Sequence, residues 1–242
     1  MNTVVRRDSG PDPYRPGVGA VLASTWRVGT PERQRAAVDA IAETWESRDW
    51  PDGGLLSYTV LIGDDGDTLL HYSQWTAEEA YDDFVRTFRD DRNAEIDAAV
   101  PGIDRVALHR YGPPYRSAVL SEKSAGAAPD LVTPGLVVVA EAVFDGADSA
   151  RQRTWVDDVF AAMDADAGER PAPGGIGAHF HLSTDGTRVL NYAEWESVRA
   201  FEEWQAADGA DTGLWAKVHH HPGLVESRVR RYTPALNLRA GV

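Results

Sequence analysis

Two short segments repeat each other, and this repeat limits the possible folds more than any other feature. HYSQW at residues 71–75 is matched 120 residues later (195 minus 75) by NYAEW at residues 191–195. Each segment follows an Asp-Gly pair, beginning at Asp65 or Asp185, and each precedes a helical pattern. The match indicates a duplicated unit, in which a strand ends at tryptophan and has a polar residue four positions earlier.

The predicted elements of the first copy run strand, helix, strand, strand, helix, strand. Thr30-Pro31 is typical of a helix start, and Asp65-Gly66 is typical of a hairpin turn. The same order recurs from about residue 136. This order predicts an α+β chain of two fused ferredoxin-like domains, with antiparallel sheets and both helices of each domain on one face. Strands of the first copy are predicted at residues 18–28, 55–63, 68–75 and 106–111.

The length of 242 residues is compatible with one or two domains, and the repeat indicates two. Residues 1–16 are rich in Pro, Asp and Arg and are predicted to form a flexible arm. Residues 17–112 form the first domain, and 113–134, rich in Ala, Ser, Gly and Pro, the linker. The second domain takes residues 135–242.

The composition excludes several classes of binding partner and cofactor. The 24 Lys and Arg against 38 Asp and Glu give a net charge of -14, which disfavours nucleic acid and anionic membranes. No cysteine is present, so disulfides, thiolate nucleophiles and Cys-ligated metals are excluded. No signal peptide or membrane-spanning run is apparent, which predicts a cytoplasmic protein. An aromatic small molecule is the expected partner.

The turns predict which side chains share a face. If both hairpins close in two-residue turns, Asn191 lies opposite Phe180, and Trp195 lies opposite Ile176. Residues four apart on a strand share a face and stand about 13 Å apart at roughly 3.3 Å per residue. Asn191 and Trp195 are therefore predicted to bracket a flat molecule of several fused rings. In the first copy the same arithmetic pairs His71 with Val60, Ser73 with Tyr58, and Trp75 with Leu56.

The strand order, the spacing of NYAEW at residues 191–195 and the run WTAEEAY at residues 75–81 resemble the antibiotic biosynthesis monooxygenase family. Its members are small ferredoxin-like proteins that dimerise into an α+β barrel. The resemblance covers both repeats. It implies that the fused halves form an intramolecular pseudo-dimer, which can dimerise further. It also implies an oxygenase that converts anthrones or phenols of polycyclic aromatic polyketides to quinones with dioxygen, without metal or heme.

Family members that oxidise anthrones surround the substrate with an Asn, a Trp and, six residues later, a Tyr. The second copy supplies Asn191 and Trp195 but has Phe201 in place of the Tyr, and it is the better match. The first copy supplies Trp75 and Tyr81 but has His71 in place of the Asn. The resemblance therefore implies these catalytic candidates: Asn191, Trp195, His71, Trp75 and Tyr81. The substrate-binding candidates around them are Phe180, Phe201, Ile176, Tyr58 and Trp155.

For the oxidation of an anthrone, the protein must bind the substrate, exclude water and stabilise an oxyanion. The Asn191 amide and the Trp195 indole N–H are suitable neutral donors, and His71 is a candidate proton acceptor. Core packing alone is the alternative explanation for the aromatic residues. The enzymatic alternative is ring opening of an angucycline-type intermediate with reduced flavin as a diffusible cosubstrate. A non-oxidative cyclase or binding protein is the third possibility.

Heme and metal sites are not expected. Heme-degrading members of the superfamily carry a ligating His about ten residues after the Trp, where this chain has Val85 and Gln205. The histidines at residues 219–221 are adjacent on a predicted loop and seldom converge on one ion. His179 and His181 share a strand face, but no third ligand is evident.

Overall fold

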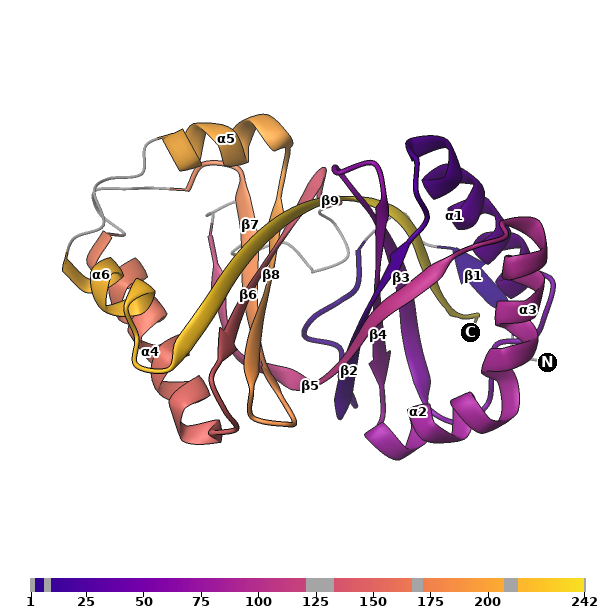
Figure 1. The fold of residues 1–242 in the computed structure, drawn as a ribbon, viewed down its shortest axis with the longest axis horizontal. Helices are drawn as coiled ribbons and strands as arrows, with labels where there is room; N and C mark the ends of the chain where they lie inside the picture. The colour runs from indigo at the N-terminus through magenta and orange to yellow at the C-terminus, as the bar shows by residue number, and fades with distance from the viewer. Residues whose placement is uncertain (1–2, 7–9, 121–132, 167–171, 207–212, 242) are drawn as a thin grey trace. The chain divides into compact units, whose positions relative to one another are not determined.

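The computed structural model describes residues 3–6, 10–120, 133–166, 172–206 and 213–241 (Figure 1). The chain forms two compact units, Met1–Pro113 with Tyr232–Val242, and Pro114–Arg231. In each unit, helices pack on one face of an antiparallel sheet (Figure 1). The predicted fold class, two fused ferredoxin-like α+β domains, is confirmed.

In the first unit the strands lie in the order β3-β4-β2-β5, the arrangement of a ferredoxin-like sheet. The Thr30 hydroxyl caps the first helix by accepting from Arg33 N at 3.2 Å, and Pro31 follows the cap. The elements are β2 (Ala20–Arg27), α1 (Pro31–Glu46), β3 (Leu55–Gly63), β4 (Thr68–Trp75), α2 (Glu78–Phe84), the π-helix η1 (Val85–Arg89), α3 (Asp90–Ala99) and β5 (Asp104–Val119).

The second unit repeats this plan with the strand order β7-β8-β6 and pairing of β6 with β9. Its elements are β6 (Leu136–Phe144), α4 (Ser149–Asp166), β7 (Gly175–Ser183), β8 (Arg188–Trp195), α5 (Val198–Ala206), α6 (Gly213–His219) and β9 (Leu224–Ala240).

The last strand of each copy is longer than predicted. β5 continues through Pro113 and Pro114 to Val119, and it pairs with β2 first and with β7 later. The linker predicted at 113–134 is therefore wrong for residues 113–119, while residues 121–132 lie outside the described ranges. Similarly, the end of β9 pairs with β3, so residues 232–242 group with the first unit and not with the predicted second domain. The extension of β5 pairs with β7, and the extension of β9 lies between β1 and β3, so both extensions gain backbone partners that are distant in the sequence.

The arm predicted at residues 1–16 is wrong where β1 (Val4–Arg6) pairs with the end of β9. Beyond β1, main-chain carbonyls satisfy buried amide side chains of the sheet. Gly10 O accepts from Asn237 Nδ2 at 3.0 Å, and Asp12 O accepts from Gln74 Nε2 at 2.6 Å. These contacts hold the segment, because a buried amide without a partner is costly.

The hairpins confirm the predicted register at the polar residues but not at the tryptophans. Val60 lies opposite His71, and Phe180 lies opposite Asn191. Near the strand ends the register shifts, so that Leu55 faces Trp75 and Gly175 faces Trp195. The predicted partners Leu56 and Ile176 are wrong, because each incoming strand has a bulge that adds one residue.

Both tryptophan-terminated strands are held by the same close backbone approach. Gly19 N donates to Trp75 O at 2.9 Å, and Gly135 N donates to Trp195 O at 3.0 Å. A Cβ atom on Gly19 would collide with the carbonyl oxygen of Thr76, and one on Gly135 with that of Glu196. Glycine is therefore required at both positions because another backbone passes too close for a side chain.

We expect Gly19→Ala to lower the free energy of unfolding by about 1–3 kcal/mol, the usual cost of forcing atoms into a filled space. Gly112→Ala is the matched control, because an added Cβ there meets no atom of the described residues within 4 Å. Urea unfolding of both variants measures the difference. Equal stability of the two variants would show that the strand end relaxes without cost.

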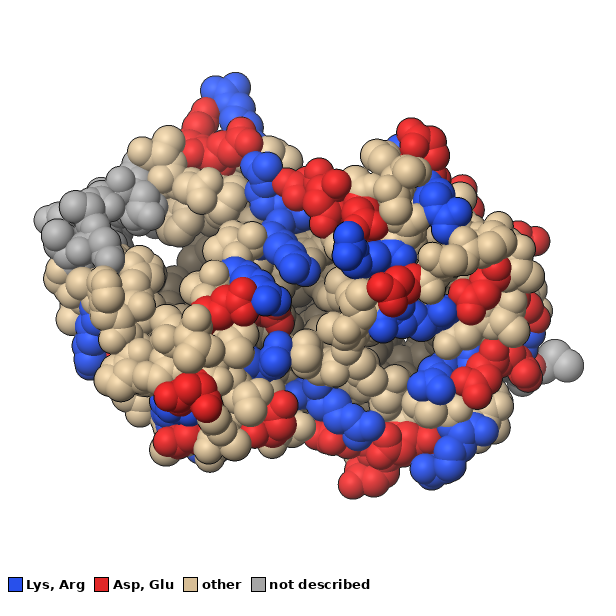
Figure 2. Space-filling model, in the orientation of Figure 1, with Lys and Arg blue, Asp and Glu red and all other residues tan. Residues whose placement is uncertain are grey.

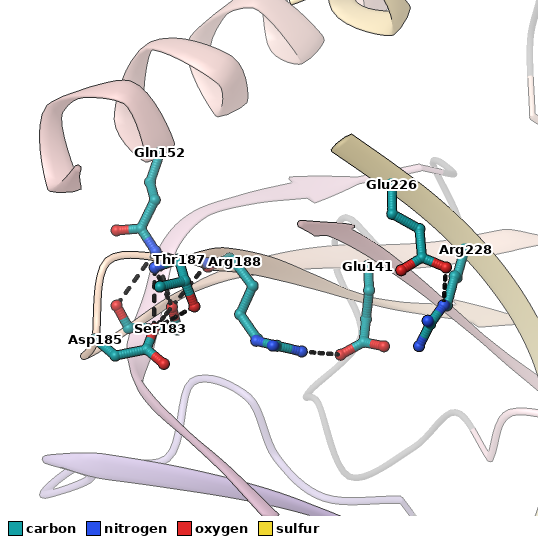
Figure 3. Close-up of polar contacts among 8 residues, drawn as sticks. All are labelled: Glu141, Gln152, Ser183, Asp185, Thr187, Arg188, Glu226 and Arg228. Carbon is teal, nitrogen blue, oxygen red and sulfur yellow. Dashed lines mark hydrogen bonds and ion pairs between the residues drawn. The ribbon is translucent and has the colours of Figure 1, made fainter. Parts of the chain in front are cut away.

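A glutamine on the first helix of each unit contacts the hairpin, a repeated feature that the sequence comparison did not reveal. Gln34 Nε2 donates to Gly63 O at 2.9 Å and to Thr68 O at 2.8 Å. Gln152 Nε2 donates to Ser183 Oγ at 3.0 Å and to Arg188 O at 2.6 Å (Figure 3). Each glutamine thereby fixes its helix against the turn that sets the register of the strands.

Acidic and basic side chains are interspersed over the face of the molecule seen in Figure 2. The second unit contains the ion pairs Arg188–Glu141, at 3.8 Å, and Arg228–Glu226 (Figure 3). Across the described ranges, no helix combines the length and the apolar character needed to cross a membrane.

Candidate functional site

The first unit contains a cavity of about 450 Å³ between its sheet and its helices. This volume lies within the range of pockets that bind small molecules, roughly 300–1,000 Å³. The sheet contributes residues of β2, β3, β4 and β5, and the helices contribute residues of α1, α2, η1 and α3. Its lining includes seven aromatic side chains: Trp26, Trp45, Tyr58, His71, Trp75, Tyr81 and Phe84.

Strand alternation explains the floor of the cavity. His71, Ser73 and Trp75 are every second residue of β4, so their side chains share the face that the helices cover. Tyr58 of β3 lies opposite Ser73 in the register, as predicted. The predicted residues His71, Trp75, Tyr81 and Tyr58 are therefore together in one cavity.

His71 and Tyr58 form a buried hydrogen-bonded pair. The Tyr58 hydroxyl is 2.6 Å from His71 Nδ1, and the His71 side chain is almost completely buried. Trp26 covers the imidazole with a ring-centroid distance of 4.1 Å, and Trp45 stacks on Tyr58 at 4.7 Å. Within the described part of the chain, the buried His71 Nε2 has no hydrogen-bond partner.

The electrostatics of this pair determine the position of its protons. Burial, assisted by repulsion from Arg105, lowers the pKa of His71 to about 3, so the imidazole is neutral at ordinary pH. Burial raises the pKa of Tyr58, so its hydroxyl keeps its proton. If Tyr58 donates that proton to Nδ1, the neutral imidazole carries its own hydrogen on Nε2. The pair thus favours His71 as a hydrogen-bond donor over the proton acceptor that the sequence suggested.

Trp75 and Tyr81 meet edge to face, with ring centroids 5.4 Å apart. The Trp75 indole N–H donates to Ser73 Oγ at 2.8 Å, so the indole orients the serine hydroxyl. Burial raises the pKa of Tyr81, which keeps its hydroxyl protonated. This cluster therefore places neutral hydroxyl groups on an aromatic wall.

In the second unit, four of the predicted residues belong to the hydrophobic core: Phe180, Trp195, Phe201 and Trp155. Trp195 and Phe201 meet edge to face at 5.3 Å, the same arrangement as Trp75 with Tyr81. The Trp155 indole donates to Val218 O at 3.2 Å, which ties α4 to α6.

The other two predictions for the second unit have different outcomes. Asn191 is half-buried, and its Oδ1 is a buried acceptor without a partner among the described residues. Such an atom costs free energy unless a ligand or water satisfies it. Ile176 is only partly buried and does not belong to the core that contains Trp195, because the bulge at residues 175–177 shifts it out of register.

Several lining residues were not anticipated as site residues. Trp26 belongs to the strand predicted at residues 18–28, and neither it nor Trp45, Arg92 or Arg105 is among the predicted site residues. Trp45 carries a readable signal, because it stands on the helix face of α1 that covers the sheet. No sequence signal predicts the π-helix η1, although π-helical turns are frequent at functional sites.

The histidines outside the cavity have other neighbours. His179 Nδ1 lies 3.0 Å from Ser117 Oγ, and His179 Nε2 lies 3.7 Å from a Glu194 carboxylate oxygen. His221 Nε2 lies 3.9 Å from an Asp158 oxygen. Among the residues that the structure describes, no three His, Asp or Glu side chains are grouped so as to hold a metal ion.

Comparison with known proteins supports the fold of the whole chain and the family resemblance of the second domain. Residues 150–212 match the family described as antibiotic biosynthesis monooxygenase. The crystal structure of an anthrone oxidase-like protein is 15% identical with a TM-score of 0.66, over 98% of this chain and 96% of that one. No protein of curated function matches the sequence.

Two bacterial structures have the same fold at lower identity. A putative monooxygenase from Fusobacterium nucleatum is 7% identical with a TM-score of 0.56, over 94% of this chain and 98% of that one. Another from Lactobacillus acidophilus is 8% identical with a TM-score of 0.53, over 90% and 95%. The predicted resemblance to the antibiotic biosynthesis monooxygenase family is thus confirmed, by the match at residues 150–212 and by the shared fold.

Proposed function

We propose that this protein is an oxygenase of the antibiotic biosynthesis monooxygenase type, which oxidises a polycyclic aromatic anthrone or phenol to a quinone in the cavity of the first unit. The observation that carries the proposal is the buried His71–Tyr58 pair in an aromatic cavity of about 450 Å³. Flat aromatic walls suit a fused-ring substrate, and a neutral imidazole donor suits the oxygen atom of its enolate.

The proposed reaction starts when the anthrone loses a proton to water and becomes an enolate. The enolate passes an electron to dioxygen, and recombination forms a carbon–oxygen bond in a peroxide. Loss of water then leaves the new carbonyl group. The CH₂ group supplies both hydrogens of that water molecule and all four electrons that reduce dioxygen, two for each oxygen atom. The balance therefore needs no external reductant, and we propose that no metal, heme or flavin takes part.

The residues of the cavity have distinct proposed roles. His71 Nε2–H donates to the substrate oxygen and lowers the pKa of the bound anthrone, because a fixed donor held in place by the buried Tyr58 stabilises the developing anion. Tyr58 is a positioning residue that holds the tautomer of His71. Trp75 and Tyr81 provide the wall on which the rings lie.

An oxygen electrode tests the proposal, with a 1,8-dihydroxyanthrone as substrate and a chelator present. We expect oxygen consumption equimolar with quinone formation, well above the rate with His71→Ala enzyme. A strict requirement for added reduced flavin would contradict the proposal and favour oxidative ring opening. Quenching of tryptophan fluorescence without oxygen uptake would contradict it in favour of a cyclase or binding protein.

A further inference from the structure

The cavity of the first unit is cationic although the protein is acidic. Three arginines line it, Arg89, Arg92 and Arg105, while no Asp or Glu among the described residues does. The whole chain has a net charge of -14. Positive groups gathered in a pocket of low dielectric attract an anion much more strongly than the same groups in water.

Arg92 differs from the other two arginines in its partners. Arg89 is paired with Asp90 at 3.0 Å, and Arg105 is paired with Asp97 at 2.9 Å. For Arg92, the hydrogen bonds within the described chain are to main-chain carbonyls, Phe88 O at 3.3 Å and Asp49 O at 3.4 Å. Both bonds are long for N–H···O contacts. Arg92 Nε is buried without a partner among the described residues.

Arg92 is also almost fully desolvated. Its side chain is 4% exposed, and its guanidinium lies 4.8 Å from the ring centroid of Trp45 and 5.8 Å from that of Phe84. Burial lowers the pKa of Arg92, as expected for a cation removed from water. Stacking on aromatic rings compensates only part of the lost hydration, and a carboxylate would compensate more.

We propose that the cavity takes an aromatic substrate with an anionic substituent, a carboxylate, and that Arg92 binds this group. The inference rests on the proposed function, because it specifies the substrate class of the same cavity. The planar guanidinium can bind a carboxylate through two parallel hydrogen bonds. These bonds orient the aromatic rings of the substrate and also increase its affinity.

The test compares two ligands that differ in one substituent. The probes are 4,5-dihydroxyanthraquinone-2-carboxylate and its neutral 2-hydroxymethyl analogue, with binding followed by quenching of tryptophan fluorescence. We expect the wild-type protein to bind the carboxylate about 10–100-fold more tightly, the usual gain of a hydrogen bond to a charged group. Arg92→Met should bind both probes with the affinity that the wild-type protein has for the neutral one.

Arg116→Met is the matched control. It removes one guanidinium that also stacks on an aromatic ring, 3.8 Å from the centroid of Phe160 in the second unit, and pairs with Asp157. We expect this variant to keep the preference for the carboxylate. Equal binding of the two probes by the wild-type protein would overturn the inference even if Arg92→Met fails to fold. A preference that persists in Arg92→Met would overturn it as well.

These measurements separate the inference from the proposed function. Oxygen uptake with a neutral anthrone tests the reaction and needs no carboxylate. A protein that oxidises the neutral anthrone but binds both probes equally would retain the proposed function and lose the anion subsite. A protein that prefers the carboxylate probe without oxidising any anthrone would retain the subsite and lose the proposed reaction.

Discussion

His71→Ala is expected to lower kcat for anthrone oxidation by about 10²–10³-fold, the usual cost of removing one preorganised donor to an oxyanion. His71→Asn is expected to retain most of the activity. An asparagine amide restores a neutral N–H donor near the same place, and the second copy has Asn191 at this position of the repeat. The His71→Asn variant therefore has a side-chain N–H donor that His71→Ala lacks, while neither variant has a basic side chain at this position.

Oxygen uptake and quinone absorbance under substrate saturation give kcat for each variant. If His71→Asn is as impaired as His71→Ala, the imidazole acts as a base and the assignment of a neutral donor is wrong. Asn191→Ala and Trp195→Phe are the controls in the second unit, and we expect both to leave kcat unchanged. A comparable loss in either control would move the active site to the second unit.

Much of the fold could be predicted because the repeat and the turn residues are local signals. Asp65-Gly66 and Asp185-Gly186 place the hairpins, and alternation along the strands then gives the partners of His71 and Asn191 correctly. The glycines of both pairs have positive φ, +72° and +75°. A turn residue of this kind specifies its register with little help from the rest of the chain.

The strand ends could not be predicted, because their partners are distant in the sequence. Nothing near Pro113 indicates that β5 continues to Val119, since that extension depends on an edge of β7. The pairing of Val5 with Arg239 likewise joins the two ends of the chain. The bulges that displace Leu56 and Ile176 depend on the same long-range fit.

The candidate site was predicted in part for a similar reason. Strand alternation placed His71, Trp75 and Tyr58 on one face. The helix side was harder, because the helix predicted after Trp75 contains the π-helix η1 at Val85–Arg89. The wider turn changes which residues of α3 share a face with Tyr81, and spacing of 3.6 residues per turn does not foresee it. Arg92 was missed for this reason.

The structure also changes which copy is the stronger candidate. The family pattern favoured the second copy because Asn191 matches it by residue type. The neighbours of His71 argue for the first copy, since Tyr58 and the rings of Trp26 and Trp45 give the imidazole a defined tautomer and keep it neutral. An Asn in one copy and a neutral His in the other can therefore provide the same donor, which residue identity alone does not reveal.

The pH dependence of stability is expected to reveal the buried His71 directly. The pKa of this group is about 3 in the folded protein, against 6.5 for an ordinary histidine. Between these values the unfolded chain binds more protons, so the free energy of unfolding rises with pH. The contribution of His71 is fully present above pH 6.5 and is lost progressively as pH falls towards 3. From pH 6.5 to 5, we expect a loss of about 1.5 kcal/mol from this group alone.

Urea unfolding of the wild-type protein and His71→Asn at both pH values isolates this loss. Asp67, Asp82, Asp148 and Asp185 also have lowered pKa values, so acid destabilises both proteins through them, and their effect cancels in the difference. Wild-type stability should fall more steeply than that of His71→Asn. Parallel curves would mean that His71 accepts a proton in the folded state as readily as in water. The imidazole of His71 would then be a base available to the substrate, and the assignment of a neutral donor would be wrong. An inactive His71→Asn enzyme would lead to the same conclusion, so the stability and activity measurements test the same property of His71.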